Sequence, residues 1–242
     1  MTSDSHSATR SNIGELFDRI AARYDFLNHL LSLNIDKRWR RKAVAALDSS
    51  AHPAPTHILD VAIGTGDLAM ELIRQHKADK ITGIDVSAEM MRIGKDKIDK
   101  AGLNERISFR QASALQMPFE ADTFDAVTCA YGVRNFADLD TGLREMYRVL
   151  RPGGQLMILE FSHPTNRLFA RLYDIYFTHI LPGVGRLISG DRTAYTYLNR
   201  SVKAFVDAPQ MCDHLSDAGF LQIHSTPLTY GITTIYSARK LV

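Results

Sequence analysis

Apolar and polar positions alternate with two different periods along the middle of this 242-residue chain. From residue 57 to 161, short runs of apolar and β-branched residues are separated by segments in which apolar residues recur every three or four positions. The runs predict strands, and the segments between them predict helices. The predicted strands are 57–62, 81–85, 106–110, 124–130 and 155–161, and the predicted helices are 67–76, 88–100 and 138–149. This alternation is typical of an α/β domain with a mostly parallel, doubly wound sheet.

The segment before these strands predicts a helical cap. Residues 1–11 are small and polar, without the apolar stretch of a signal peptide, and we expect them to be disordered. Apolar residues then recur at helical spacing over 13–27, and a second helical pattern over 36–47 contains Trp39. Residues 12–56 are therefore predicted to form an N-terminal helical cap that ends in a linker to the core.

The alternation of strands and helices is interrupted after the fifth strand. Residues 163–208 carry an apolar, aromatic-rich pattern that predicts a helical insertion. A helix at 209–219 follows, and strands near 220–226 and 230–238 are predicted to form an antiparallel hairpin. The predicted fold is therefore α/β and Rossmann-like, with N-terminal helices, a seven-stranded, mostly parallel, doubly wound sheet and a helical insertion after strand five. The domain spans residues 57–242.

The first strand leads into the turn Gly64-Thr65-Gly66, which is typical of mononucleotide-binding sites. Taken alone, Gly-x-Gly-x-x-Ala fits a dinucleotide site as well as a site for S-adenosylmethionine (SAM). A pyrophosphate needs backbone N–H groups without competing anions. Asp60 and Asp67 flank this turn, however, and no Lys or Arg lies between Ile58 and Ile73. Two carboxylates favour a cationic ligand, and SAM carries an ammonium and a sulfonium but no phosphate. We therefore expect Asp60, Gly64 and Gly66 to form part of a SAM site.

Two further strand ends supply candidate cofactor contacts. Asp85 ends the second strand, where a carboxylate can accept hydrogen bonds from both ribose hydroxyls. Ser113 and Ala114 follow the third strand. A serine at this edge can bind the adenine amino group, and a role as a turn residue is an equally good interpretation.

The fourth strand runs into Tyr131-Gly132-Val133-Arg134-Asn135. The carboxyl end of a central strand at the switch point of the sheet is where chemistry is expected. Gly132 permits close approach, and Arg134 supplies a fixed positive charge. The Asn/Asp-Pro-Pro-aromatic tetrad, which is usual for methylation of amide or base nitrogens, is absent from this position. The pattern therefore points to another kind of acceptor.

Composition excludes several classes of protein. Apolar residues make up 45% of the chain and charged residues 23%, as in ordinary globular proteins, and a net charge of +2 is too small to imply nucleic acid as a partner. Two cysteines are too few for a disulfide framework. No run approaches the ~20 apolar residues of a membrane span. We expect a cytoplasmic protein, without a metal site.

Four motifs along nearly the whole chain carry a family resemblance. They are Phe17-Asp18-x-Ile20-Ala21-x-x-Tyr24-Asp25-x-x-Asn28 with Trp39 downstream, Leu59-Asp60-Val61-Ala62-x-Gly64-Thr65-Gly66-Asp67, Tyr131-Gly132-Val133-Arg134-Asn135, and Arg148-Val149-Leu150-Arg151-Pro152-Gly153-Gly154 running to Glu160-Phe161-Ser162. In these motifs the chain resembles the demethylmenaquinone methyltransferase family, the C-methyltransferases of menaquinone and ubiquinone biosynthesis. The glycine motifs are shared by most SAM enzymes, whereas Tyr-Asp-x-x-Asn…Trp and Gly-x-Arg-Asn are more specific.

The resemblance implies methyl transfer from SAM to a ring carbon of a prenylated hydroquinone, with demethylmenaquinol and a ubiquinol precursor as alternative acceptors. It implies SAM contacts at Thr65, at Asp85 and at the pair Ser113–Ala114. Arg134 is the candidate to stabilise the developing phenolate, and Asn135 and Tyr24 are the other candidate catalytic residues. The general base stays open among neighbours of this site. Three positions depart from the family pattern. Ser113 stands where asparagine is commoner, Ala130 replaces a serine found in some members, and Asp36 replaces a frequent histidine.

The prenyl tail of such an acceptor is buried in a bilayer, so the enzyme needs a segment that contacts the membrane. The segment 163–208 is the candidate for this contact. Its apolar residues, with Arg167, Arg171 and Arg186 nearby, resemble an interfacial amphipathic segment that contacts the inner face of the cell membrane. A lid over the site and the interface of a homodimer are equally good interpretations.

Three other functions stay open at this point. They are SAM-dependent methylation of another small acceptor, a non-catalytic SAM-fold partner protein, and an NAD-dependent oxidoreductase. The carboxylates Asp60 and Asp67 oppose the last of these, as does the absence of an obvious Tyr-x-x-x-Lys after the fourth strand. Arg134 and Asn135 oppose a non-catalytic role.

Overall fold

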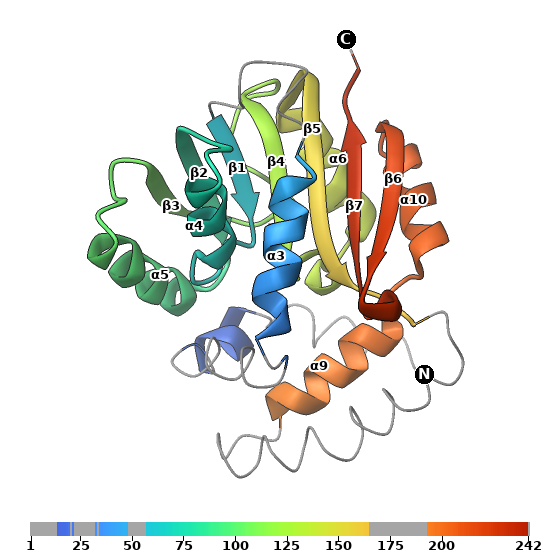
Figure 1. Ribbon diagram of the computed structural model, residues 1–242, viewed down its shortest axis with the longest axis horizontal. Helices are drawn as coiled ribbons and strands as arrows, with labels where there is room; N and C mark the ends of the chain where they lie inside the picture. Colours follow the sequence, from blue (N-terminus) through green and yellow to red (C-terminus); the bar gives the residue numbers. More distant parts are fainter. Residues whose placement is uncertain are drawn as a thin grey trace.

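A seven-stranded sheet forms the centre of the protein in the computed structural model, which describes residues 14–19, 21, 32, 34–47, 57–164 and 193–241 (Figure 1). The strands are β1 (His57–Val61), β2 (Lys80–Asp85), β3 (Ile107–Gln111), β4 (Phe124–Ala130), β5 (Leu150–Phe161), β6 (Leu221–Leu228) and β7 (Thr233–Arg239). Their order in the sheet is β3-β2-β1-β4-β5-β7-β6. Neighbouring strands are parallel except for β7, which pairs antiparallel with both β5 and β6. The predicted sheet and its antiparallel hairpin are confirmed.

Helices cover both faces of this sheet, so the predicted doubly wound arrangement is also confirmed. The helices α3 (Ile35–Ala45), α4 (Asp67–Arg74) and α5 (Ala88–Lys100) pack on one face, and α6 (Leu139–Val149) and α10 (Ala208–Asp217) pack on the other. The apolar residues of β1 require cover on both faces, since Ile58 is buried on the α3 side and Leu59 on the α6 side. A parallel strand that is apolar on both faces needs cover on both.

Strand β5 begins at Leu150, earlier than the predicted start at Gln155. The sequence predicts a turn at Pro152-Gly153-Gly154, but this segment stays paired with the chain beyond β7. The Gly153 N–H donates to the Lys240 carbonyl at 2.7 Å, and the Lys240 N–H donates to the Gly154 carbonyl at 3.1 Å. A pairing partner distant in the sequence therefore extends the strand through residues that locally favour a turn.

Helix α3 crosses one face of the sheet and is attached at the end of β5 and at the turn after β6 (Figure 1). The Trp39 indole packs edge-on against Phe161, with ring centroids 6.5 Å apart. Its Nε1–H donates to the Thr229 hydroxyl at 2.8 Å. Thr229 opens η3 (Thr229–Gly231), in which all three residues have positive φ. These contacts fix α3 beside the carboxyl edge of the parallel strands.

The parts of the chain outside the described residues include the predicted disordered segment 1–11, Tyr24 and most of the predicted insertion 163–208. Helix α9 (Thr193–Ala204) falls within the range of that insertion and lies along the carboxyl edge of the sheet (Figure 1). Among the described residues, none of the helices combines the length and apolarity that crossing a membrane requires.

Candidate functional site

A cavity of about 470 Å³ opens at the carboxyl edge of the sheet. Its lining comes from the segments that follow β1, β2, β3 and β4, and from a helical segment at 14–19. The cavity spans the point where the strand order reverses, between β1 and β4. Ligands of open α/β sheets bind at such a switch point, so this cavity is the candidate site.

Asp85 connects the end of β2 to the glycine turn. Its carboxylate lines the cavity and accepts hydrogen bonds from the backbone N–H groups of Gly64, at 2.8 Å, and Ser87, at 2.9 Å. Burial raises the pKa of the Asp85 carboxyl, and these donors oppose that shift. The structure thus brings two predicted residues, Asp85 and Gly64, to one wall of the cavity. Gly66 caps α4 with φ of +83° and lies behind this wall.

Thr65 and Asp67 point away from the cavity. The Thr65 hydroxyl accepts a hydrogen bond from Lys97 Nζ at 3.3 Å, and Asp67 forms ion pairs with Lys97 at 2.5 Å and Arg40 at 3.1 Å. The charge of Asp67 is therefore compensated by cations on α5 and α3. The prediction that Asp67 favours a cationic ligand was therefore wrong. The two cations that compensate it are distant in the sequence, and a local pattern does not reveal them. Neither Thr65 nor Asp67 lines the cavity.

Asp60 lies beneath the glycine turn rather than in the cavity wall. Its side chain is 1% exposed, and Oδ1 accepts a hydrogen bond from the Thr128 hydroxyl at 2.9 Å. Oδ2 has no hydrogen-bond partner among the described residues. Burial therefore raises the pKa of this carboxyl from 3.8 to about 7.

We expect Asp60→Asn to stabilise the protein at pH 8 and to leave stability unchanged near pH 4. Because the pKa of this acid is raised by folding, the folded state holds the proton more tightly, and stability is lost as pH rises from about 4 to about 7. The amide cannot ionise, so the variant avoids a loss on the order of 4 kcal/mol. Thermal unfolding between pH 4 and 8 measures the effect, with Asp79→Asn at an exposed position as the matched control. A lower unfolding temperature for Asp60→Asn at pH 8 would contradict it.

The segment after β3 fits both a cofactor contact and a turn role for Ser113. Ser113 and Ala114 line the cavity, as predicted for cofactor contacts. The Ser113 hydroxyl also accepts a hydrogen bond from the Leu115 N–H at 3.1 Å, so it shapes the turn in which it lies.

The segment after β4 turns through an unusual backbone conformation at Tyr131. This residue has φ of +58°, a region that costs a non-glycine residue on the order of 1–3 kcal/mol unless its surroundings hold it there. Its ring stacks on Phe161 with centroids 4.6 Å apart, and its N–H donates to the Leu159 carbonyl at 2.7 Å. The Tyr131 carbonyl accepts hydrogen bonds from Arg134 Nη1 at 2.5 Å and Asn135 Nδ2 at 3.4 Å.

Arg134 and Asn135 occupy different sides of this wall. Asn135 lines the cavity, and its Oδ1 accepts a hydrogen bond from the Tyr197 hydroxyl on α9 at 2.9 Å. The Arg134 side chain is 4% exposed, lies behind the wall and forms an ion pair with Glu160 at 2.8 Å. Its guanidinium also lies 5.3 Å from the ring centroid of Phe161. Asn135 is thus the predicted catalytic residue that lines the cavity, and Arg134 is paired behind it.

Two further sets of residues have a place at the cavity or behind its wall that was not predicted from the sequence. Glu160 is an acid inside the apolar run of β5. Because acids are rarely buried without a partner, its position in the sequence already indicates a buried partner. The segment 14–19 reaches the cavity through Gly14, Glu15, Phe17 and Asp18, and no local pattern indicates this placement. Asp18 holds the segment against α5, because it accepts hydrogen bonds from the Ser87 hydroxyl at 2.5 Å and the Glu89 N–H at 3.0 Å.

The charges at the cavity are of one sign. Glu15, Asp18 and Asp85 line it, and among the described lining residues there is neither lysine nor arginine. Carboxylates in the lining of a cavity favour a cationic ligand and disfavour a pyrophosphate. The expectation of a cationic ligand therefore rests on these three carboxylates.

Comparison with known proteins agrees with the sequence motifs. The model of the ubiE/COQ5 methyltransferase family matches residues 4–240. A demethylmenaquinone methyltransferase of Bacteroides fragilis is 43% identical over 228 residues, which cover 94% of this chain and 92% of that protein. A ubiquinone/menaquinone biosynthesis C-methyltransferase UbiE of Geotalea daltonii is 45% identical over 229 residues, which cover 94% and 96%.

The fold has solved relatives at much lower identity. The structure of a SAM-dependent methyltransferase from Thermotoga maritima superposes with a TM-score of 0.65 at 16% identity, covering 94% of this chain and 99% of that chain. This likeness confirms the Rossmann-like fold and carries no further conclusion. The resemblance in the four motifs is confirmed by the family model and by both sequence relatives: the chain belongs to the ubiE/COQ5 methyltransferase family.

Proposed function

We propose that this protein transfers the methyl group of SAM to a ring carbon of a demethylated, prenylated hydroquinone in respiratory quinone biosynthesis. Demethylmenaquinol is the first candidate acceptor, and the ubiquinol precursor is the second. The names of the relatives from Bacteroides fragilis and Geotalea daltonii support this acceptor class. The observation that carries the proposal is the acidic cavity at the switch point, with the Asp85 carboxylate in its wall.

The cavity offers a suitable group for each part of SAM. We propose that the Asp85 carboxylate accepts hydrogen bonds from the ribose hydroxyls and that Ser113 contacts the adenine, since both residues line the cavity at neighbouring strand ends. Glu15 and Asp18 add negative charge around a ligand that carries two cationic groups. Bound SAM supplies an electrophilic methyl group to the site.

The acceptor needs a deprotonated ring hydroxyl, because an aromatic carbon is otherwise a poor nucleophile. The protein has to hold that carbon near the methyl group, at ~3–3.5 Å, and to bind the developing phenolate. We propose that Asn135 contacts the acceptor, since this residue lines the cavity and its amide is held by Tyr131 and Tyr197. Tyr24 lies outside the described residues, and its catalytic role stays a prediction.

A prenylated acceptor also bears on where the protein works. We propose a cytoplasmic protein with peripheral contact with the inner face of the cell membrane, since the acceptor's tail resides in the bilayer. The segment predicted to make this contact, 163–208, lies mostly outside the described residues. A homodimer through the same segment is the alternative.

The proposal is tested by transfer of tritium from methyl-labelled SAM to acceptors presented in anionic liposomes. We expect label in menaquinol when demethylmenaquinol is supplied, and a parallel reaction with a demethylated ubiquinol precursor compares the two acceptors. An unprenylated N-methyl acceptor such as histamine is the negative control. Binding of SAM without transfer to either quinol would refute the proposed acceptor class.

A further inference from the structure

The wall of the cavity from Tyr131 to Phe136, here called the β4 wall, is held from behind by one buried charge pair. The wall begins at Tyr131, whose positive φ is not a conformation that its own sequence favours. A neighbouring group therefore has to fix the peptide that follows. Arg134 Nη1 does so, because it donates to the Tyr131 carbonyl at 2.5 Å.

Glu160 determines where the Arg134 guanidinium lies. The Glu160 side chain is completely buried at the end of β5 and bonds to the β4 wall twice. Its Oε1 accepts from Arg134 Nη1 at 2.8 Å, and its Oε2 accepts from the Arg134 N–H at 3.3 Å. Oε1 also accepts from the Phe161 N–H at 2.8 Å, which fixes the carboxylate on its own strand. Glu160 thus links β5 to both the backbone and the side chain of the wall.

The contacts continue from the wall to the cavity and to α9. Asn135 Nδ2 shares the Tyr131 carbonyl with Arg134, and Asn135 Oδ1 accepts from the Tyr197 hydroxyl. The orientation of the Asn135 amide is therefore defined from two sides. One side is the wall that Glu160 and Arg134 fix, and the other is helix α9.

We propose that Glu160 is a positioning residue, which acts through Arg134 to fix the Tyr131 carbonyl and thereby the Asn135 amide that faces the acceptor. Tyr197 completes the arrangement from α9. In this role the Arg134 charge is neutralised behind the wall and does not act directly on the reacting oxygen. The proposal deepens the proposed function and rests on it for its activity measurement.

The test is a double-mutant cycle with Glu160→Gln, Arg134→Gln and the variant that carries both changes. Each single change leaves one charged group of the pair buried opposite a neutral amide. We therefore expect kcat to fall about 10-fold to 100-fold, because the β4 wall is displaced. In the double variant two neutral amides face each other, and we expect kcat about tenfold above that of Arg134→Gln. The binding constant of SAM, measured by calorimetry, should change less than about threefold because Asp85 and Ser113 are untouched.

Two results would overturn the proposal. A double variant no more active than Arg134→Gln would mean that the Arg134 charge itself acts on the acceptor. A Glu160→Gln enzyme with wild-type kcat would mean that the pair contributes to folding alone. Inactivity of the wild-type protein towards every quinol acceptor would instead refute the proposed function, so the two failures are distinguishable.

A variant on the opposite side of Asn135 keeps the proposal testable if a single change in the pair prevents folding. Tyr197→Phe removes only the hydroxyl that donates to Asn135, on a half-buried side chain. We expect kcat to fall at least about threefold with the SAM binding constant unchanged. Tyr147→Phe makes the same chemical change away from the cavity and serves as the matched control, with wild-type kcat expected. Wild-type kcat for Tyr197→Phe would overturn the part assigned to α9.

Discussion

Asp85→Ala is expected to weaken SAM binding about 100-fold. The change removes the carboxylate that we propose accepts hydrogen bonds from the ribose. It also removes the group to which the Gly64 N–H donates at 2.8 Å. A hydrogen bond to a charged group contributes about 1.5–3 kcal/mol, and about 1.4 kcal/mol corresponds to a tenfold change in binding. A loss near 3 kcal/mol is therefore expected, and calorimetric titration with SAM measures it directly.

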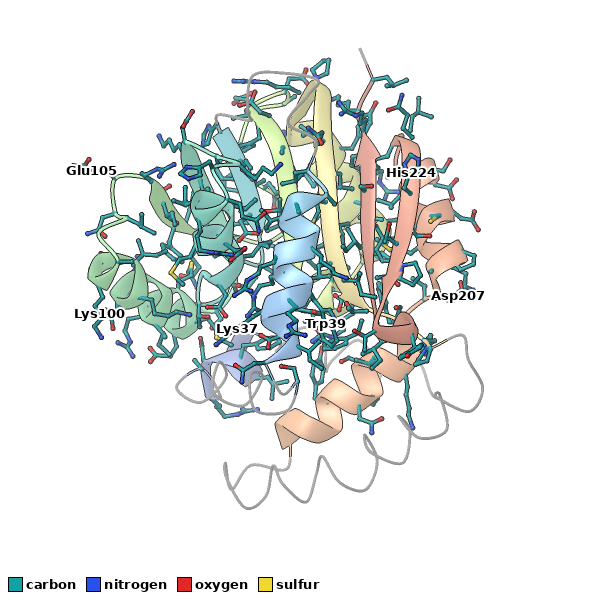
Figure 2. All side chains as sticks on the ribbon, viewed as in Figure 1. Lys37, Trp39, Lys100, Glu105, Asp207 and His224 are labelled. Carbon is teal, nitrogen blue, oxygen red and sulfur yellow. The ribbon has the colours of Figure 1, made fainter. Side chains whose placement is uncertain are left out.

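The matched control for this variant is Glu105→Ala. Glu105 is an exposed acid on the loop before β3, far from the carboxyl edge where the cavity opens (Figure 2). Its removal changes the net charge by the same amount, so a general electrostatic effect would appear in both variants. If Asp85→Ala bound SAM within about threefold of wild type, the ribose contact assigned to Asp85 would be wrong.

Gly132→Ala is expected to lower kcat at least about 100-fold and to reduce the free energy of unfolding by about 1–3 kcal/mol. A Cβ atom at Gly132 would lie 2.6 Å from the Ala62 Cβ and 2.6 Å from the Cys129 Sγ, so the β4 wall has to move away from the glycine turn. This displacement changes the spacing between two sides of the cavity, because Ala62 and Gly64 line one side and Tyr131 and Gly132 the other. Methyl transfer under saturating substrates and chemical denaturation measure the two effects.

A second variant tests whether this contact is the cause. Ala62→Gly removes one of the two obstructing atoms, at a position whose φ of +56° suits glycine. The double variant Ala62→Gly/Gly132→Ala should therefore recover part of the lost stability and activity. Wild-type kcat in Gly132→Ala alone would show that the wall accommodates a methyl group.

The succession of strands and helices along the chain could be predicted from the sequence because its signals are local. The parallel strands are short apolar runs, and most of them are separated by helices with a different periodicity. The β-branched residues Ile58 and Ile81, for example, are both buried in the core on the α3 side of the sheet. The start of β5 was predicted wrongly for the opposite reason. Its pairing through Gly153 depends on Lys240, which no pattern near residue 153 reveals.

The same distinction explains the predictions of site residues. Asp85, Ser113 and Asn135 lie at the ends of strands, and topology alone brings the ends of neighbouring parallel strands to one edge. The direction of the Arg134 guanidinium depends instead on Glu160, 26 positions later on another strand. The environment of Asp67 likewise depends on Arg40 and Lys97, which come from two other helices. Position in the fold is predictable here, whereas side-chain partners across elements are not.

The environment of Trp39 gives the protein a built-in optical probe. Trp39 is the only tryptophan in the chain, so the emission of the folded protein under selective excitation comes from one indole. That indole, labelled in Figure 2, comes from α3. It contacts Phe161 and Thr229, and Phe161 stacks in turn on Tyr131 of the cavity wall. Movement of α3 away from the sheet would expose the ring to water and shift its emission to longer wavelength. Displacement of α3 from the sheet can therefore be followed by fluorescence without attaching a label.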